Sequence, residues 1–126
     1  MTVIITRAVQ TSMACPAQWD AWDADGNYYY LRFRHGYGTV TQYENEDWVG
    51  ADPQQEHRHV ADFEHGSDQD LGAITLPEFA GRAGLQLAPG LAETGFGDHL
   101  RDELVIRGLS YAVADQVTQP WRDLQE

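Results

Sequence analysis

Residues 17–34 read AQWDAWDADGNYYYLRFR, and this stretch decides the fold of the N-terminal third. Asp25-Gly26 is a two-residue hairpin turn signal, and strand-forming residues flank it on both sides. A two-residue turn at this point pairs Trp22 with Tyr29. The stretch therefore predicts an antiparallel β-hairpin.

The two faces of this hairpin differ in chemistry, because side chains alternate along a strand. The face that suits a core better carries Trp22, Tyr29, Leu31 and Phe33. The opposite face carries Trp19, Tyr28, Tyr30, Arg32 and Arg34. Trp, Tyr and Arg dominate binding hot spots, so this second face is a candidate partner-binding surface. The alternative is that a helix covers this face, and that the Arg side chains extend past the edge of the covered area to place their charges in water.

Further strands extend the hairpin on both sides. Residues 2–10 are rich in Val, Ile and Thr and predict a strand. A turn at 35–38 leads to a strand at 39–43, and residues 57–65 fit a fourth strand of the meander.

A helix start follows at Thr75. Thr75 can cap the helix, Pro77 sits in its first turn and Glu78 completes a capping box. The helix is expected to run to about Ala83, since Gly84 is a natural stop.

The remaining C-terminal segment carries mixed signals. Pro89 and Gly90 indicate an irregular stretch, and Asp98 can cap a second helix that ends at about Arg107. Residues 103–107 fit a strand equally well. Residues 109–117 are ambiguous between strand and helix.

Length and composition fit a single α+β domain over the 126 residues. Four Trp, six Tyr and four Phe are enough for a real core. We expect a mostly antiparallel sheet of four to five strands, with one or two short helices from the C-terminal half. The β-meander core occupies 2–65, and a mixed helix and loop part occupies 66–126.

The net charge of −12 is unevenly distributed. Residues 1–43 sum to zero, so the whole excess lies in 44–126. The stretch 44–56 predicts an exposed acidic loop that carries Glu44, Glu46, Asp47, Asp52 and Glu56. Such a surface repels nucleic acid and anionic membranes, so we expect neither as a direct partner. It can meet a basic protein, as a DNA mimic does, or simply maintain solubility.

Cysteine content and the N-terminus indicate a cytoplasmic protein. Cys15 is the single cysteine, so no intramolecular disulfide can form. We find no signal peptide and no run near the ~20 apolar residues that a membrane helix needs.

Two histidines form the candidate metal site. His57 and His59 point the same way on a strand, and such a pair can hold a metal ion. Asp62 is expected to face away from them, so a third ligand must come from elsewhere, such as His35 or His99. A metal-dependent enzyme is therefore a further alternative, and a polar surface strand is the simpler interpretation.

Catalytic signatures are otherwise missing from the sequence. It contains no Gly-x-Ser-x-Gly elbow, and a chain without Lys has no phosphate-binding Gly-Lys loop. We expect no cofactor and regard an enzyme as the less favoured interpretation.

The hairpin also carries a resemblance. Its pattern is Asp25-Gly26-x-x-Tyr29-x-x-Arg32-x-Arg34-x-Gly36, which resembles small uncharacterised proteins of actinobacteria and their phages. The resemblance implies no known activity, fold or site residue. We expect a non-catalytic accessory protein, encoded by a phage or mobile element, that binds a protein partner.

Overall fold

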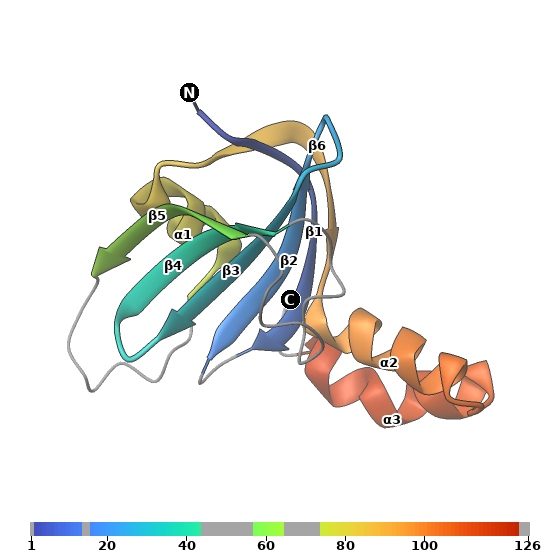
Figure 1. Ribbon diagram of the computed structural model, residues 1–126. Coiled ribbons are helices and arrows are strands. Elements are labelled where there is room, and N and C mark those ends of the chain that lie inside the picture. Colours follow the sequence, from blue (N-terminus) through green and yellow to red (C-terminus); the bar gives the residue numbers. More distant parts are fainter. Residues whose placement is uncertain (1, 14–15, 44–56, 65–73, 124–126) are drawn as a thin grey trace.

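The computed structural model describes residues 2–13, 16–43, 57–64 and 74–123. Within these residues the chain forms one six-stranded sheet and three helices (Figure 1). The elements are β1 (Ile4–Met13), β2 (Ala17–Asp23), β3 (Tyr28–Arg34), β4 (Tyr37–Tyr43), β5 (His57–Glu64), α1 (Leu76–Ala83), β6 (Gln86–Thr94), α2 (Phe96–Ile106) and α3 (Tyr111–Asp123).

The strands lie in the order β5-β4-β3-β2-β1-β6. Strands β1 to β5 form a continuous antiparallel meander, and β6 joins its edge parallel to β1. The predicted α+β class with a mostly antiparallel sheet is therefore confirmed. The predicted counts of four to five strands and one or two helices were too low: among the described residues β6 adds a sixth strand, paired in parallel with β1, and there is a third helix.

The β2–β3 hairpin differs in register from the predicted one by one residue. Trp22 pairs with Tyr28 and not with Tyr29, and Trp19 pairs with Leu31. Because a one-residue slip exchanges the faces of one strand relative to the other, Trp19 joins the core face and Trp22 leaves it. The predicted faces are wrong for these two tryptophans.

A three-residue loop, closed by Asp23 and Asn27, causes this shift. Gly26 lies in the left-handed region at φ 84°, as in hairpin loops that combine a type I turn with a bulge. Asp23 Oδ1 accepts hydrogen bonds from the backbone N–H groups of Asp25 and Asn27 at 2.9 and 3.0 Å. Asp23 Oδ2 accepts from Asn27 Nδ2 and from the Tyr29 hydroxyl, both at 2.9 Å. The aspartate therefore fixes the longer loop.

The next turn is tighter than predicted. His35 and Gly36 have φ values of 54° and 76°, the signature of a two-residue turn with both residues left-handed. Strand β4 therefore begins at Tyr37, two residues before the predicted start.

One face of the sheet carries the core, and α1 packs over it (Figure 1). The ring of Phe79 on α1 lies 5.6 Å from that of Trp19 and 5.0 Å from that of Phe63. Trp19, Phe79 and Leu31 are each 1% exposed or less. Burying a large apolar side chain contributes roughly 1.5–3 kcal/mol, so this three-element contact anchors α1.

Helix α1 begins and ends as predicted. The Thr75 side chain accepts a hydrogen bond from the Glu78 backbone N–H at 3.3 Å, and Pro77 occupies the first turn. Gly84 ends the helix in the left-handed conformation at φ 77°. These signals lie within a few residues of each helix end, so the sequence alone was sufficient to predict where α1 begins and ends.

Strand β6 corrects the prediction of an irregular stretch around Pro89 and Gly90. Ile5 pairs with Leu87, but Arg7 pairs with Ala92, so a bulge separates the two parts of the β1–β6 ladder. A bulged edge strand can hold a proline, because the missing N–H breaks no interior ladder.

The C-terminal helices form an antiparallel pair, called here the helical hairpin. Helix α2 contacts β1, and α3 packs on α2. Helix α2 is capped by Gly95 and not by the predicted Asp98, and the ambiguous stretch 109–117 belongs largely to α3. Within the described residues, no helix is long and apolar enough to cross a membrane.

Candidate functional site

The predicted partner-binding residues do not share one surface. Trp19 lies in the core and is 1% exposed. Tyr28 is on the opposite face but is only 2% exposed, because its ring packs between Trp22 and Tyr43 and its hydroxyl donates to Asp20. The register shift therefore removes Trp19 from the predicted set, and burial removes Tyr28 from contact with solvent.

The other three residues of the set lie along one face of β3. Tyr30 is half-buried, and burial raises the pKa of its hydroxyl above the ordinary value. Arg32 is also half-buried, and its Nε atom has no hydrogen-bond partner. Arg34 is exposed and donates from Nε to His35 Nε2 at 3.1 Å. Their role in binding a partner stays a prediction.

The histidine strand has a different arrangement from the predicted one. A bulge opposite Val40 and Thr41 makes Val60 an extra residue, so the side chains before and after it exchange faces. Asp62, expected to face away, instead lies 2.8 Å from His59 through Oδ2 and Nε2.

His57 and His59 gain no third ligand among the described residues. The ring of His57 packs 5.7 Å from that of Tyr43. No group of three or more potential His, Cys, Asp or Glu ligands comes together in the part of the chain that the structure describes. Binding of metal by His57 and His59 stays a prediction.

The predicted acidic surface lies outside the described residues. Its five members all fall within 44–56: Glu44, Glu46, Asp47, Asp52 and Glu56. The DNA-mimic hypothesis, which rests on these residues, therefore stays a prediction.

The helical hairpin presents a surface that the sequence interpretation did not include. Among the described residues, nine large apolar side chains are exposed, and seven of them lie between 105 and 121. These seven are Val105, Ile106, Leu109, Tyr111, Val113, Val117 and Trp121. Figure 1 shows why: the two helices project sideways from the end of the sheet where β6 ends.

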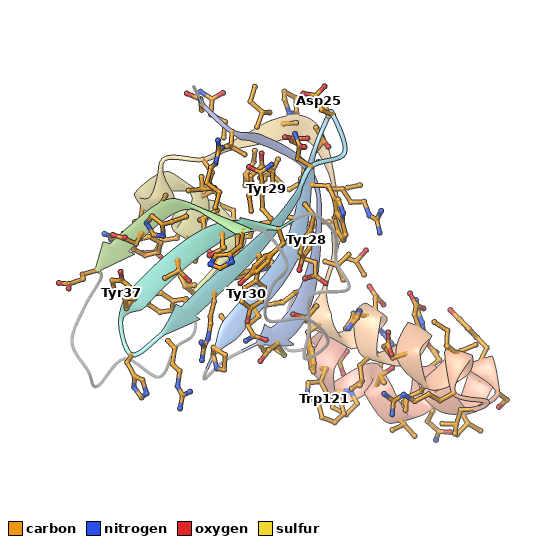
Figure 2. All side chains as sticks on the ribbon, viewed as in Figure 1. Asp25, Tyr28, Tyr29, Tyr30, Tyr37 and Trp121 are labelled. Carbon is orange, nitrogen blue, oxygen red and sulfur yellow. The ribbon has the colours of Figure 1, made fainter. Side chains whose placement is uncertain are left out.

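Three of these side chains form an apolar stripe along α3. Val113, Val117 and Trp121 follow each other at intervals of four residues, which places them on one helix face. They are 48%, 52% and 37% exposed. Trp121 lies at the end of the hairpin next to the sheet (Figure 2), with its ring 6.5 Å from that of Phe96 on α2.

The buried residues of the two helices are small. The fully buried residues of α3 are Ala114 and Thr118, and Gly97 is buried on α2. The Thr118 hydroxyl donates back to the Ala114 carbonyl at 2.7 Å. Small side chains bring the backbones close, but they bury little apolar area. The hairpin therefore keeps most of its large apolar side chains outside its own interface.

The charged side of the hairpin is paired within itself. Arg122 Nη2 lies 2.8 Å from Asp115 Oδ1, and Arg101 Nη1 lies 3.3 Å from both Asp115 and Asp98. Burial lowers the pKa of Arg101, but the hydrogen bond to Asp115 and the nearby Tyr111 and acids outweigh it, so the net shift is upward. Asp115 and Arg122 lie on nearly the opposite side of α3 from the apolar stripe, given 3.6 residues per turn.

Comparison with protein-family profiles, with curated proteins and with solved structures found no match in any of the three. The site therefore has to be interpreted from its own geometry. One sequence signal could have located it, because the four-residue spacing of Val113, Val117 and Trp121 is typical of an amphipathic helix.

Proposed function

We propose that this chain is a non-catalytic accessory protein that binds another protein through the helical hairpin. The observation that carries the proposal is the exposed apolar stripe of Val113, Val117 and Trp121 on an element that projects from the sheet. The helical hairpin carries seven of the nine large apolar side chains that are exposed among the described residues. Exposed apolar side chains that gather in one region mark interaction sites on soluble proteins.

The proposed partner is a different protein with a basic rim around an apolar groove. The chain carries −12, so two copies repel each other, whereas a basic partner is attracted and associates faster. The stripe itself contains no charged residue, and the nearby Arg101 and Arg122 are already paired with acids. Apolar contact therefore supplies the affinity, and the charge of the whole chain selects the partner.

An origin in an actinobacterial phage or mobile element and a place in the cytoplasm belong to the same proposal. All eight basic residues are Arg, as expected from a high-GC genome, and the Asp25–Gly36 pattern resembles actinophage proteins. The single cysteine fits a reducing compartment.

The test is co-purification of the untagged protein from its native host, with mass spectrometry and chemical cross-linking. A Val113→Asp/Val117→Asp variant should lose the partner, because a carboxylate in a desolvated apolar contact is costly. Tyr37→Ser is the matched control, since Tyr37 is also an exposed apolar side chain but lies on β4. Support requires a stoichiometric basic partner whose cross-links fall on α3 and whose binding Tyr37→Ser retains.

Three results would overturn the proposal. One is a partner retained by the folded α3 variant. Another is a partner lost instead from Tyr30→Ala/Arg32→Ala, which would move the site to the sheet. The third is a homodimer, seen by analytical ultracentrifugation, that the α3 variant disrupts.

A further inference from the structure

A second candidate site lies at the other end of the molecule, on the core face of the sheet. A cavity of about 390 Å³ opens there between the start of β1, the β2–β3 loop and single residues of β3, β4 and β5. No residue of α1 lines it. Its volume falls within the range of small-molecule pockets.

The cavity floor is a row of side chains that crosses three strands. Arg58 pairs with Gln42, and Gln42 pairs with Tyr29, so the three stand side by side on one face. Asp25, at the tip of the β2–β3 loop, also lines the cavity, with Tyr29 below it (Figure 2). Val3 lines the β1 side.

Two exposed residues of the lining, Arg58 and Asp25, carry opposite charges. Among the residues that the structure describes, none forms an ion pair or hydrogen bond with the Arg58 side chain. Asp23, although it also lines the cavity, already accepts four hydrogen bonds from Asp25, Asn27 and Tyr29. The Asp25 carboxylate is therefore the acceptor left for a cation.

We propose that this cavity binds a small zwitterion of the amino-acid or dipeptide class. Its carboxylate meets the Arg58 guanidinium, whose planar fork suits bidentate contact. Its ammonium group lies towards Asp25, and its apolar part lies against Val3 and Ile4. Asp25 and the ionised Asp23 repel a simple anion, and a simple cation leaves the Arg58 guanidinium without a partner, so a ligand with both charges matches this lining better. This site is independent of the helical hairpin.

The test titrates the full chain with glycyl-leucine, its N-acetyl form and its C-terminal amide, up to about 10 mM. The NMR signals of Tyr29 and Gln42 report occupancy of the cavity. Glycyl-leucine should shift both signals, and each blocked peptide should bind about tenfold more weakly. Arg58→Gln should weaken glycyl-leucine binding about tenfold without weakening binding of the C-terminal amide, which has no carboxylate for Arg58 to hold. Asp25→Asn should likewise weaken glycyl-leucine binding about tenfold without weakening binding of the N-acetyl form, which has no ammonium group for Asp25 to hold.

Arg82→Gln is the matched control, because Arg82 is an exposed arginine of α1 outside the cavity. It should leave glycyl-leucine binding unchanged. The proposal is overturned if neither signal moves, if the three peptides bind equally well, or if Arg82→Gln weakens binding as much as Arg58→Gln.

Discussion

The Tyr29 hydroxyl donates a hydrogen bond to Asp23 Oδ2 across 2.9 Å. This contact joins the last residue of β2 to β3, beyond the loop that separates them. Asp23 also holds the backbone of that loop, so one carboxylate fixes both the loop conformation and the pairing of the strands. The register of the hairpin, and with it the choice of core residues, depends on this aspartate.

Replacing Asp23 should therefore destabilise the fold. Asp23→Asn removes the charge from four hydrogen bonds, and we expect a loss of about 1–3 kcal/mol in the free energy of unfolding. Asp25→Asn is the control, because Asp25 is exposed and should change stability by less than about 0.5 kcal/mol. Urea denaturation at pH 7 measures both. Equal stability of the two variants would show that the Asp23 contacts are not needed.

The difference in the free energy of unfolding between the wild type and the Asp23→Asn variant should also depend on pH. Partial burial alone raises the pKa of Asp23, but hydrogen bonds from Asn27, Tyr29 and Asp25 outweigh it and hold the pKa below 3.8. A carboxyl with a lowered folded-state pKa stabilises the fold above its unfolded pKa, and that stability is lost as pH falls through the folded value. The difference in stability between the two proteins should shrink below about pH 4. A difference that stays constant down to about pH 2.5 would contradict this account.

Tyr29 should titrate at unusually high pH. Burial, and then the hydrogen bond to Asp23, raise its pKa to about 12 from 10.0. Because the folded-state pKa is raised, the stabilisation is complete below pH 10 and is lost as pH rises towards 12. Ultraviolet difference titration of the wild type against Tyr29→Phe should show a midpoint near pH 12. A midpoint near 10.0 would mean that the hydroxyl is solvated and not bound to Asp23.

The two tryptophans of β2 give a direct test of the register. Trp19 is buried against Phe79, and Trp22 is half-buried with the Arg7 guanidinium 4.2 Å from its ring. Trp19→Ala should lower the free energy of unfolding by about 3–5 kcal/mol, whereas Trp22→Ala should lower it by about 1–2 kcal/mol. The predicted two-residue turn requires the reverse order. If Trp19→Ala does not fold, Trp19→Phe and Trp22→Phe should keep the same ranking in thermal denaturation.

The β2–β3 hairpin also shows what the sequence could and could not predict. The Asp-Gly signal located the turn, because turn preference is local. It did not distinguish a two-residue loop from a three-residue loop with Gly26 left-handed, and that one-residue difference moved Trp19 into the core. The helix start at Thr75 was predicted correctly for the same local reason.

Non-local features were the ones missed. Strand β6 pairs with β1 although most of the chain lies between them, and its Pro89-Gly90 bulge hides the strand pattern. The β5 bulge is equally invisible in sequence and brought Asp62 to His59. For the binding surface, the spacing of Val113 and Val117 indicates a helix, but their exposure depends on where the helical hairpin projects.

The close contact between α2 and α3 at Gly97 provides the last prediction. A Cβ atom at this position would lie 2.6 Å from Arg122 Cγ and 2.7 Å from the Arg122 backbone N. Part of that obstacle is backbone, so α3 would have to move away and the ion pair between Arg122 and Asp115 would be disturbed. We expect Gly97→Ala to cost roughly 1–3 kcal/mol, like other overpacked sites.

Gly81→Ala is the matched control for this change. A Cβ atom at Gly81 would meet nothing within 4 Å, and the residue is exposed in α1. Alanine there should stabilise the helix by about 0.5–1 kcal/mol. Hydrogen exchange should show faster exchange in α3 for Gly97→Ala, with the sheet unchanged, and no such change for Gly81→Ala. Since the apolar stripe depends on the position of α3, Gly97→Ala should also weaken partner binding; normal α3 protection in that variant would mean that the helices do not approach this closely.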